Sequence, residues 1–188
     1  MERQNWDERY SAPDRTPLGE PNAQVVEELG ATPPGWALDL AAGEGRHARW
    51  LASLGWRVVA ADFSEAGVRR AKQLADEEGR HVDFVVADVH TLPLPPARFD
   101  LVLATFFHPR PAERAPLYRK MAGALAPGGT MLLVTYDKAH QGTINPDFLM
   151  DVLALAADLR AIGLQVTRAE TVPVPGAVNA VIRAVKPR

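Results

Sequence analysis

Residues 38–45 read Leu-Asp-Leu-Ala-Ala-Gly-Glu-Gly, and this stretch decides the fold of the chain. An apolar strand enters a turn that carries Gly43 and Gly45, and residues 46–52 then follow as a helix. Glycines at such a turn let the backbone approach a ligand closely, and the helix N-terminus behind them favours negative charge. In an alternating β/α chain, a strand, tight turn and helix of this kind bind a nucleotide-like cofactor.

Asp39 places a carboxylate inside the apolar strand, four residues before Gly43. A buried carboxylate is costly without a partner, so we expect Asp39 to have one.

Length and composition indicate one domain of ordinary globular type. The chain has 188 residues, of which 47% are hydrophobic and 23% charged, as in a water-soluble domain with a full core. The net charge of −2 gives no sign of the positively charged surface that binding to nucleic acid or to an anionic membrane would require. The charged N-terminus lacks a signal-peptide core, which favours the cytoplasm. The absence of cysteine excludes disulfides, a thiol nucleophile and Cys-based metal sites.

Alternating apolar runs and turn residues predict five βα units. We expect strands at about 36–41, 56–61, 81–87, 99–104 and 130–136, and helices at 5–10, 21–29, 46–55, 64–79, 112–125 and 146–162. Residues 164–172 and 177–185 form two more strands, and their four-residue linker is too short for a parallel crossover. The final pair is therefore antiparallel.

This order predicts an α/β fold with three layers: a Rossmann-like, mostly parallel seven-stranded sheet with an antiparallel C-terminal strand. We expect a single domain over 1–188, with a helical N-terminal arm at 1–30. A cofactor-binding core follows at 36–136, and a C-terminal helix and β-hairpin at 146–188.

Ligands of an open parallel sheet bind at the carboxyl ends of its strands, and here those ends carry a pattern. Asp62 ends the second strand and can accept both ribose hydroxyls of an adenosine, while Phe63 can cover one adenine face. Asp88 follows the third strand and can accept from the adenine amino group. The backbone N–H of Val89 can meet the ring edge. Thr105, at the end of the fourth strand, begins the run that continues to His108.

The ordered set of motifs resembles the class I S-adenosylmethionine-dependent methyltransferases, and within them the tellurite-resistance and thiopurine-like small-molecule branch. The resemblance covers nearly the whole chain to about Tyr136. It rests on residues 6–10 (Trp-Asp-Glu-Arg-Tyr), 20–22 (Glu-Pro-Asn), 38–46, 59–64, 99–108 and 125–129. Each piece alone is weak, but the ordered set is specific.

The resemblance implies a Rossmann-like methyltransferase with S-adenosyl-L-methionine as cofactor and S-adenosyl-L-homocysteine as product. The cofactor-binding residues are then Asp39, Ala41, Gly43, Gly45, Arg46, Asp62, Phe63, Ser64, Asp88, Val89, Thr105 and Phe106. The acceptor residues are Trp6, Tyr10, Phe107 and His108. His108 and Tyr10 are the candidate bases, needed only if the acceptor must lose a proton.

The chain departs from the family at two places. Ala41 stands at the first glycine of the family's turn, where alanine is common in this branch. Residues 175–178 (Pro-Gly-Ala-Val) lack the histidine pair that tellurite-type relatives often carry, which argues against tellurite chemistry itself.

The acceptor is expected to be a small molecule: a thiol, amine, hydroxyl or metalloid oxyanion. We expect neither nucleic-acid nor membrane partners, and a monomer or homodimer. No histidine spacing suits a metal, so no metal site is expected. Tyr136, at the end of the fifth strand, is expected to be structural, and residues 1–10 to form a lid ordered by ligand or an arm packed permanently on the sheet edge.

Two other functions remain open from the residues. A nicotinamide-dependent oxidoreductase fits Gly43-x-Gly45-x-x-Ala48 followed by Asp62. Asp39 in the strand, Asp88 and the terminal hairpin argue against it. A non-catalytic cofactor-binding protein would bind the ligand with no turnover.

Overall fold

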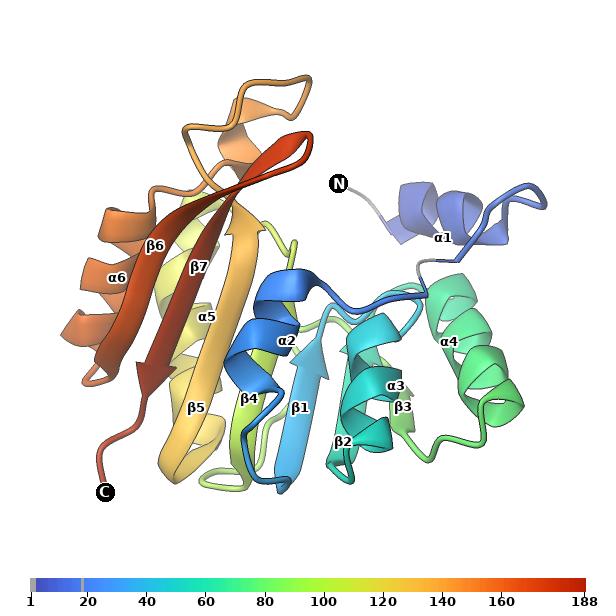
Figure 1. The fold of residues 1–188 in the computed structure, drawn as a ribbon, viewed down its shortest axis with the longest axis horizontal. Coiled ribbons are helices and arrows are strands. Elements are labelled where there is room, and N and C mark those ends of the chain that lie inside the picture. The colour runs from blue at the N-terminus through green and yellow to red at the C-terminus, as the bar shows by residue number, and fades with distance from the viewer. Residues whose placement is uncertain (1–2, 18) are drawn as a thin grey trace. The chain divides into compact units, whose positions relative to one another are not determined.

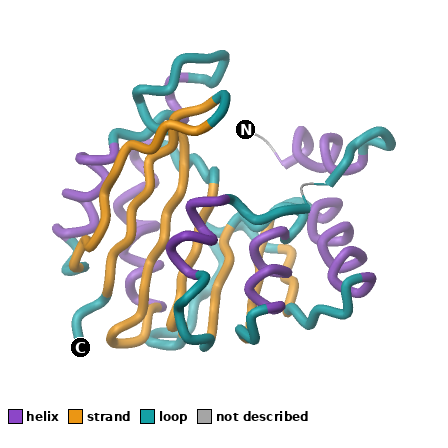
Figure 2. The backbone as a smooth tube through the Cα atoms, in the orientation of Figure 1, coloured by secondary structure: helices purple, strands orange, loops and turns teal. Residues whose placement is uncertain are grey.

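The structure is a computed structural model that describes residues 3–17 and 19–188 (Figures 1 and 2). Residues 1, 2 and 18 of the expected N-terminal arm lie outside the described residues. The chain divides into two compact units, Met1–Pro93 and Leu94–Arg188. The expected organisation as a single domain stays a prediction.

Within its described residues, the first unit holds three parallel strands and four helices. The strands are β1 (Trp36–Leu40), β2 (Arg57–Asp62) and β3 (Asp83–Val86); the helices are α1 (Arg3–Ser11), α2 (Ala23–Leu29), α3 (Arg46–Ser53) and α4 (Glu65–Glu77). In the register of β1 and β2, Asp39 lies opposite Ala60. Helix α3 packs on β1 and β2, α4 packs on β2 and β3, and α1 packs on α4. The parallel strands therefore present their carboxyl ends, and the turns that follow them, at one edge.

The second unit holds four strands and the remaining helices. The strands are β4 (Phe99–Thr105), β5 (Leu125–Tyr136), β6 (Gln165–Val174) and β7 (Ala177–Val185); the helices are α5 (Pro111–Ala124), the 3₁₀ helix η1 (Pro146–Phe148) and α6 (Val152–Ala161). Strands β4 and β5 are parallel, and β7 pairs antiparallel with both β5 and β6. Leu132, Leu159 and Ile182 are fully buried in this unit's core.

The seven strands follow the order β3-β2-β1-β4-β5-β7-β6 in one sheet, with helices on its flanks. The expected fold class is confirmed: a mostly parallel, Rossmann-like sheet with one antiparallel strand near its C-terminus. The hairpin of β6 and β7 is antiparallel as expected, and its linker is shorter than the expected four residues, because β6 extends to Val174 and β7 begins at Ala177.

The helix expected over 146–162 is wrong as one element, because the structure breaks it into η1 and α6. Met150 lies between them and forms an isolated β-bridge with Asp137, which the helix could not accommodate. Asp151 then starts α6 as its N-cap, accepting hydrogen bonds from the backbone N–H groups of Leu153 and Ala154.

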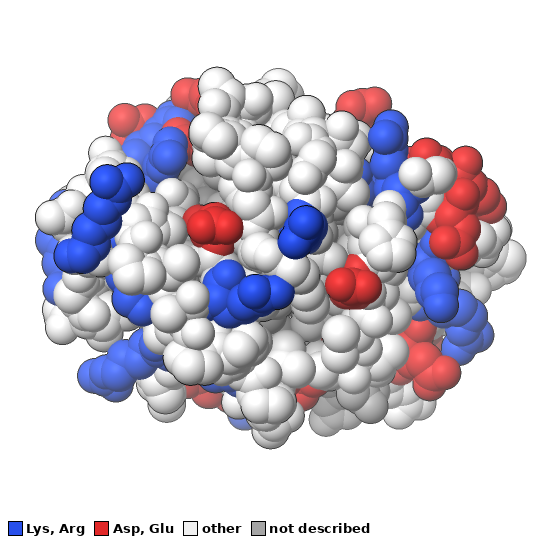
Figure 3. All heavy atoms as spheres, turned by 90° about the horizontal axis from the view of Figure 1, so that it is seen from below, with Lys and Arg blue, Asp and Glu red and all other residues white. Residues whose placement is uncertain are grey.

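The charges of the face drawn in Figure 3 are interspersed, and acidic and basic side chains alternate there without an extended field of one sign. None of the helices in the described part of the chain combines the length and the hydrophobicity that a bilayer crossing requires.

Candidate active site

The turn after β1 is held in an unusual backbone conformation. Ala41, Gly43 and Gly45 all have positive φ angles, of 56°, 57° and 71°. Only glycine adopts this left-handed region without strain, so Ala41 carries a cost of about 1–2 kcal/mol. Alanine at the family's first glycine thus preserves the shape of the turn at some cost in stability.

The two glycines serve different purposes. A Cβ atom on Gly45 would lie 2.9 Å from the ring of Phe84 and 3.1 Å from the Cβ of Ala71, so Gly45 is required by packing against β3 and α4. A Cβ atom on Gly43 would lie 2.5 Å from the hydroxyl oxygen of Tyr10. Gly43 is therefore required because the Tyr10 side chain lies directly against its backbone.

Asp62 fastens this turn to the start of α4. Its Oδ2 accepts a hydrogen bond from the N–H of Gly43 at 2.8 Å, and its Oδ1 accepts from the N–H of Ser64 at 2.9 Å. The side chain is buried. A carboxylate oxygen can accept more than one hydrogen bond, so Asp62 belongs to a residue type that can bind a ligand hydroxyl as well.

Asp39 does not have the partner that the sequence led us to expect. Its side chain is fully buried, and neither carboxylate oxygen has a hydrogen-bond partner among the described residues. Burial, and then the charge of Asp62, raise the pKa of Asp39 to about 7. The expected hydrogen-bond partner is therefore missing, and the charge of Arg46 and the backbone N–H of Ala48 offset only part of the rise in the pKa of Asp39.

Helix α1 docks on α4 through Asp7. The Oδ1 of Asp7 accepts from the hydroxyl of Ser64 at 2.6 Å and from the N–H of Ala66 at 3.1 Å. These bonds satisfy donors at the N-terminus of α4 and place a negative charge where the helix dipole favours it. The arm thus packs on a helix, and not on the sheet edge that the sequence suggested for a permanently packed arm.

Tyr10 lies at the centre of the docked arm. Its ring stacks on that of Trp6 with centroids 5.4 Å apart, and the guanidinium of Arg15 lies 5.0 Å from its centroid. Burial, then the charge of Asp62, raises the pKa of the Tyr10 hydroxyl above its usual value. Tyr10 is therefore suited to donate a hydrogen bond and unsuited to act as a base.

A buried carboxylate within the turn, that of Glu44, holds the stretch after α1 against α4. Its Oε2 pairs with Nη2 of Arg15 at 2.6 Å and its Oε1 with Nε of Arg70 at 3.0 Å. The hydrogen bond to Glu44 raises the pKa of Arg15. The sequence analysis did not single out Glu44 or Asp7. The only indication in the sequence was that each is an acidic residue within a noted motif, Glu44 in residues 38–46 and Asp7 in residues 6–10.

The Glu-Pro-Asn motif at 20–22 ties α2 to α3. Asn22 is the N-cap of α2, with its Oδ1 accepting from the N–H of Gln24 at 2.9 Å. Its own N–H donates to Nε2 of His47 at 3.1 Å. Burial, then the charge of Arg46, lowers the pKa of His47 to about 3, so this imidazole is neutral and accepts.

The other predicted cofactor residues of the first unit lie around the same strand ends. Ser64 is buried and caps α4 by accepting from the N–H of Gly67. Phe63, Arg46 and Asp88 are half-buried, and Val89 is buried. The Oδ1 of Asp88 accepts from the N–H of His90 at 2.8 Å, which fixes the turn after β3.

In the second unit, the residues predicted after β4 follow the strand end in sequence. Thr105 ends β4, and Phe106, Phe107 and His108 are half-buried. The Nδ1 of His108 lies 3.1 Å from Oγ1 of Thr135 on β5. Burial lowers the pKa of the imidazole to about 4, although a bond to the backbone of Phe148 opposes this. His108 is therefore neutral at pH 7 and a weak base.

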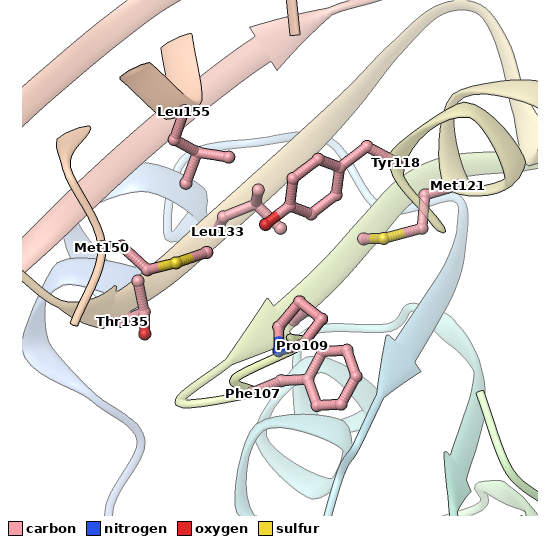
Figure 4. Close-up of a pocket in the computed structure, with 9 residues that line it drawn as sticks. Phe107, Pro109, Tyr118, Met121, Leu133, Thr135, Met150 and Leu155 are labelled. Carbon is pink, nitrogen blue, oxygen red and sulfur yellow. The ribbon is translucent and has the colours of Figure 1, made fainter. Parts of the chain in front are cut away.

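Phe107 belongs to a narrow apolar pocket on the α5 side of the second unit (Figure 4). The pocket is lined by Ala104, Phe107, Pro109, Tyr118, Met121, Leu133, Thr135, Met150 and Leu155. Its free volume of about 10 Å³ is at most enough for one water molecule. Phe107 thus packs as a core residue in this structure, and its predicted contact with the acceptor stays a prediction.

Across residues 3–17 and 19–188, no group of three or more His, Cys, Asp or Glu side chains is placed to hold a metal ion.

Comparison with known proteins assigns these features to a class. Residues 37–129 match the family model described as "Methyltransferase domain". The fold is that of the Rossmann-like methyltransferases, and residues 37–129 are similar to a methyltransferase domain.

Individual relatives are distant. The chain is 29% identical over 137 residues to the demethylmenaquinone methyltransferase of Renibacterium salmoninarum, covering 71% of this chain and 56% of that protein. The chain thus spans little more than half the length of this curated relative.

Solved structures share the fold. The 1,6-didemethyltoxoflavin-N1-methyltransferase of Burkholderia thailandensis, solved with 1,6-didemethyltoxoflavin and S-adenosylhomocysteine, is 27% identical with a TM-score of 0.72, over 88% of this chain and 76% of that one. The [4+2]-cyclase SpnF superposes with a TM-score of 0.75 at 20% identity, over 87% and 78% of the two chains. A fold shared with a protein named as a cyclase does not by itself fix the activity.

Proposed function

We propose that this protein binds S-adenosylmethionine and transfers its methyl group to a small-molecule acceptor. The observation that carries the proposal is the buried, unpartnered carboxylate of Asp39 directly before the glycine turn. Burying a carboxylate without a hydrogen-bond donor costs free energy. The ammonium group in the methionine part of the cofactor would be a donor of the opposite charge.

The other residues of the first unit fit the rest of that cofactor. Asp62, at the end of β2, would accept from the ribose hydroxyls, and Gly43 would offer bare backbone at the position where the Tyr10 hydroxyl now lies. Asp88 would accept from the adenine amino group, with Phe63 against the ring and Val89 at its edge. Arg46 would meet the methionine carboxylate, and Ala41 and Gly45 shape the turn.

The bound cofactor supplies an electrophilic methyl group on a sulfonium. In methyl transfer an electron pair of the acceptor, a lone pair or the π pair of a carbon acceptor, would form the bond to the methyl carbon as the carbon–sulfur bond breaks and leaves a neutral thioether. The protein then has to align the acceptor and exclude water. An acceptor that must lose a proton has no strong base here, because His108 has a lowered pKa and Tyr10 a raised one. The catalytic roles of both residues stay predictions.

Within the resembled small-molecule branch, we favour an organic acceptor over a metalloid oxyanion. The reported relatives are named for demethylmenaquinone and for 1,6-didemethyltoxoflavin, which are organic compounds. The histidine pair of tellurite-type relatives is also absent at 175–178. Thiol, amine, hydroxyl and carbon acceptors all remain within the proposal.

Thermal unfolding with added ligand tests the cofactor assignment. S-adenosylhomocysteine is expected to raise the unfolding temperature in proportion to the logarithm of its concentration, and NADH to leave it unchanged. Stabilisation by NADH alone would overturn the proposal in favour of an oxidoreductase. Binding of S-adenosylhomocysteine without methylation of any of the four organic acceptor classes would instead support the non-catalytic alternative.

A further inference from the structure

Five planar side chains form a continuous ring cluster in the second unit. Its members are Phe106, His108, Tyr136, His140 and Phe148. The ring of His108 stacks on that of Tyr136 with centroids 5.7 Å apart and planes at 8°, and on that of Phe148 at 5.3 Å and 20°. Tyr136 also meets Phe106 at 5.0 Å and His140 at 5.3 Å. Tyr136 is therefore the hub of the cluster.

The ring cluster is located where a ligand of this fold is expected. Phe106 directly follows β4 and Tyr136 ends β5, so both come from carboxyl ends of parallel strands. All five rings are half-buried, which means that each keeps part of its surface exposed. Tyr118 of the same unit is, by contrast, almost completely buried.

Backbone strain marks the same position. Phe106 has a φ of 51°, although a bulky residue disfavours the left-handed region. Its N–H donates to the carbonyl of Val134 at 2.7 Å, which helps to hold that conformation. Strain that is retained in this way occurs preferentially at binding and catalytic sites.

Two cations near the ring cluster are already committed to other partners. The Nε of Arg114 donates to the carbonyl of Pro109 at 3.2 Å, and Nζ of Lys138 pairs with Asp151 at 2.5 Å. His108 itself is neutral at pH 7. The cluster therefore offers π-faces to a ligand, and the nearby cations are not directed at an anion.

We infer that the methyl acceptor is a planar aromatic compound that stacks on the ring cluster, with Tyr136 and Phe148 as its binding residues. This inference rests on the proposed function, because it names the acceptor of that reaction. Offset stacking of a flat ring on such faces adds to the burial of its area, so a saturated ring of the same size binds more weakly.

The test compares 1-naphthol with its saturated counterpart, decahydro-1-naphthol. Dissociation constants are obtained by saturation-transfer NMR titration of the full chain, with and without S-adenosylhomocysteine. We expect 1-naphthol to bind at least tenfold more tightly. A merely apolar surface would bind the two compounds about equally, because they share one carbon skeleton and one hydroxyl and bury similar apolar areas. Equal affinities, or tighter binding of the saturated compound, would overturn the inference.

Variants assign the effect to the cluster. Tyr136→Leu is expected to weaken 1-naphthol binding about five- to tenfold, the size of one lost aromatic pair, while Tyr136→Phe keeps the wild-type value. The control is Trp36→Leu, which removes a half-buried ring from the amino end of β1 in the other unit. Wild-type binding by Tyr136→Leu, or equal losses in Tyr136→Leu and Trp36→Leu, would contradict the assignment.

Calorimetry with S-adenosylhomocysteine separates failure of the proposed function from failure of the aromatic-acceptor inference. If S-adenosylhomocysteine does not bind the wild type, the proposed function fails whatever 1-naphthol does. If it binds and 1-naphthol is not preferred, only the aromatic acceptor fails.

Discussion

The hydroxyl of Tyr10 lies directly over Gly43, so that a methyl group on Gly43 would lie 2.5 Å from the Tyr10 oxygen. Tyr10, the last residue of the N-terminal motif, therefore occupies the space in which a side chain at Gly43 would lie. This relationship links the arm to the proposed cofactor site, because anything that fills the space above Gly43 affects both.

We predict that Gly43→Val abolishes S-adenosylhomocysteine binding, measured by calorimetry. The branched side chain would collide with Tyr10 and occupy the ligand's place at a left-handed φ. Gly79→Val is the matched control, since Gly79 also has a positive φ but has open space around it. Both variants should lose about 1–2 kcal/mol of stability to strain. Retained binding by Gly43→Val would show that the turn is only structural.

Binding is predicted to release a proton through Asp39. Its pKa of about 7 leaves it about half protonated at pH 7, and a bound ammonium group favours the charged form. The calorimetric enthalpy should therefore differ between two buffers of different ionisation enthalpy at pH 7. In Asp39→Asn that difference should vanish and the affinity should fall by at least tenfold, whereas Asp83→Asn, at the exposed start of β3, should behave as wild type. An unchanged buffer dependence in Asp39→Asn would exclude this role.

Asp7 is predicted to control the docking of α1. Asp7→Ala removes the acceptor that Ser64 and Ala66 share, which should cost about 1 kcal/mol and speed hydrogen exchange at residues 5–10. S-adenosylhomocysteine should slow that exchange again if the arm closes over the ligand as a lid. Glu8→Ala, on the exposed face of the same helix, serves as the control. Equal exchange in Asp7→Ala and wild type would mean that the cap does not hold the arm.

Acid stability should depend on His47. Its pKa falls from 6.5 to about 3 on folding, so between these values the unfolded chain binds the extra proton and stability declines as pH falls from about 6.5 towards 3. The full shift corresponds to at most about 4–5 kcal/mol. Asp39 acts in the opposite sense, because its raised pKa gives stability that is lost as pH rises through about 7. Urea titrations from pH 4 to 7 should show a flatter profile for His47→Gln; an unchanged slope would contradict the assignment.

The strand–turn–helix at residues 36–53 and the order of the βα units could be predicted from sequence, because apolar periodicity and glycine, proline and capping residues act over a few neighbours. The carboxyl-end acids Asp39, Asp62 and Asp88 could be chosen for the same reason. Asp39 lies near the end of the first strand, Asp62 at the end of the second and Asp88 after the third, and these positions follow from the pattern alone.

Other features depend on contacts between residues far apart in the chain, and only the tertiary structure decided them. The break between η1 and α6 arises because Met150 forms a β-bridge with Asp137. Local helix propensity cannot predict this bridge, because Asp137 lies outside the expected helix. The unpartnered state of Asp39 and the docking of Asp7 on α4 likewise depend on which donors reach each carboxylate. Tyr136 was expected to be structural, and its place at the hub of the ring cluster follows from four rings brought together from residues 106 to 148. Sequence pattern fixes the faces and ends of elements, whereas the packing of distant elements fixes which side chains meet.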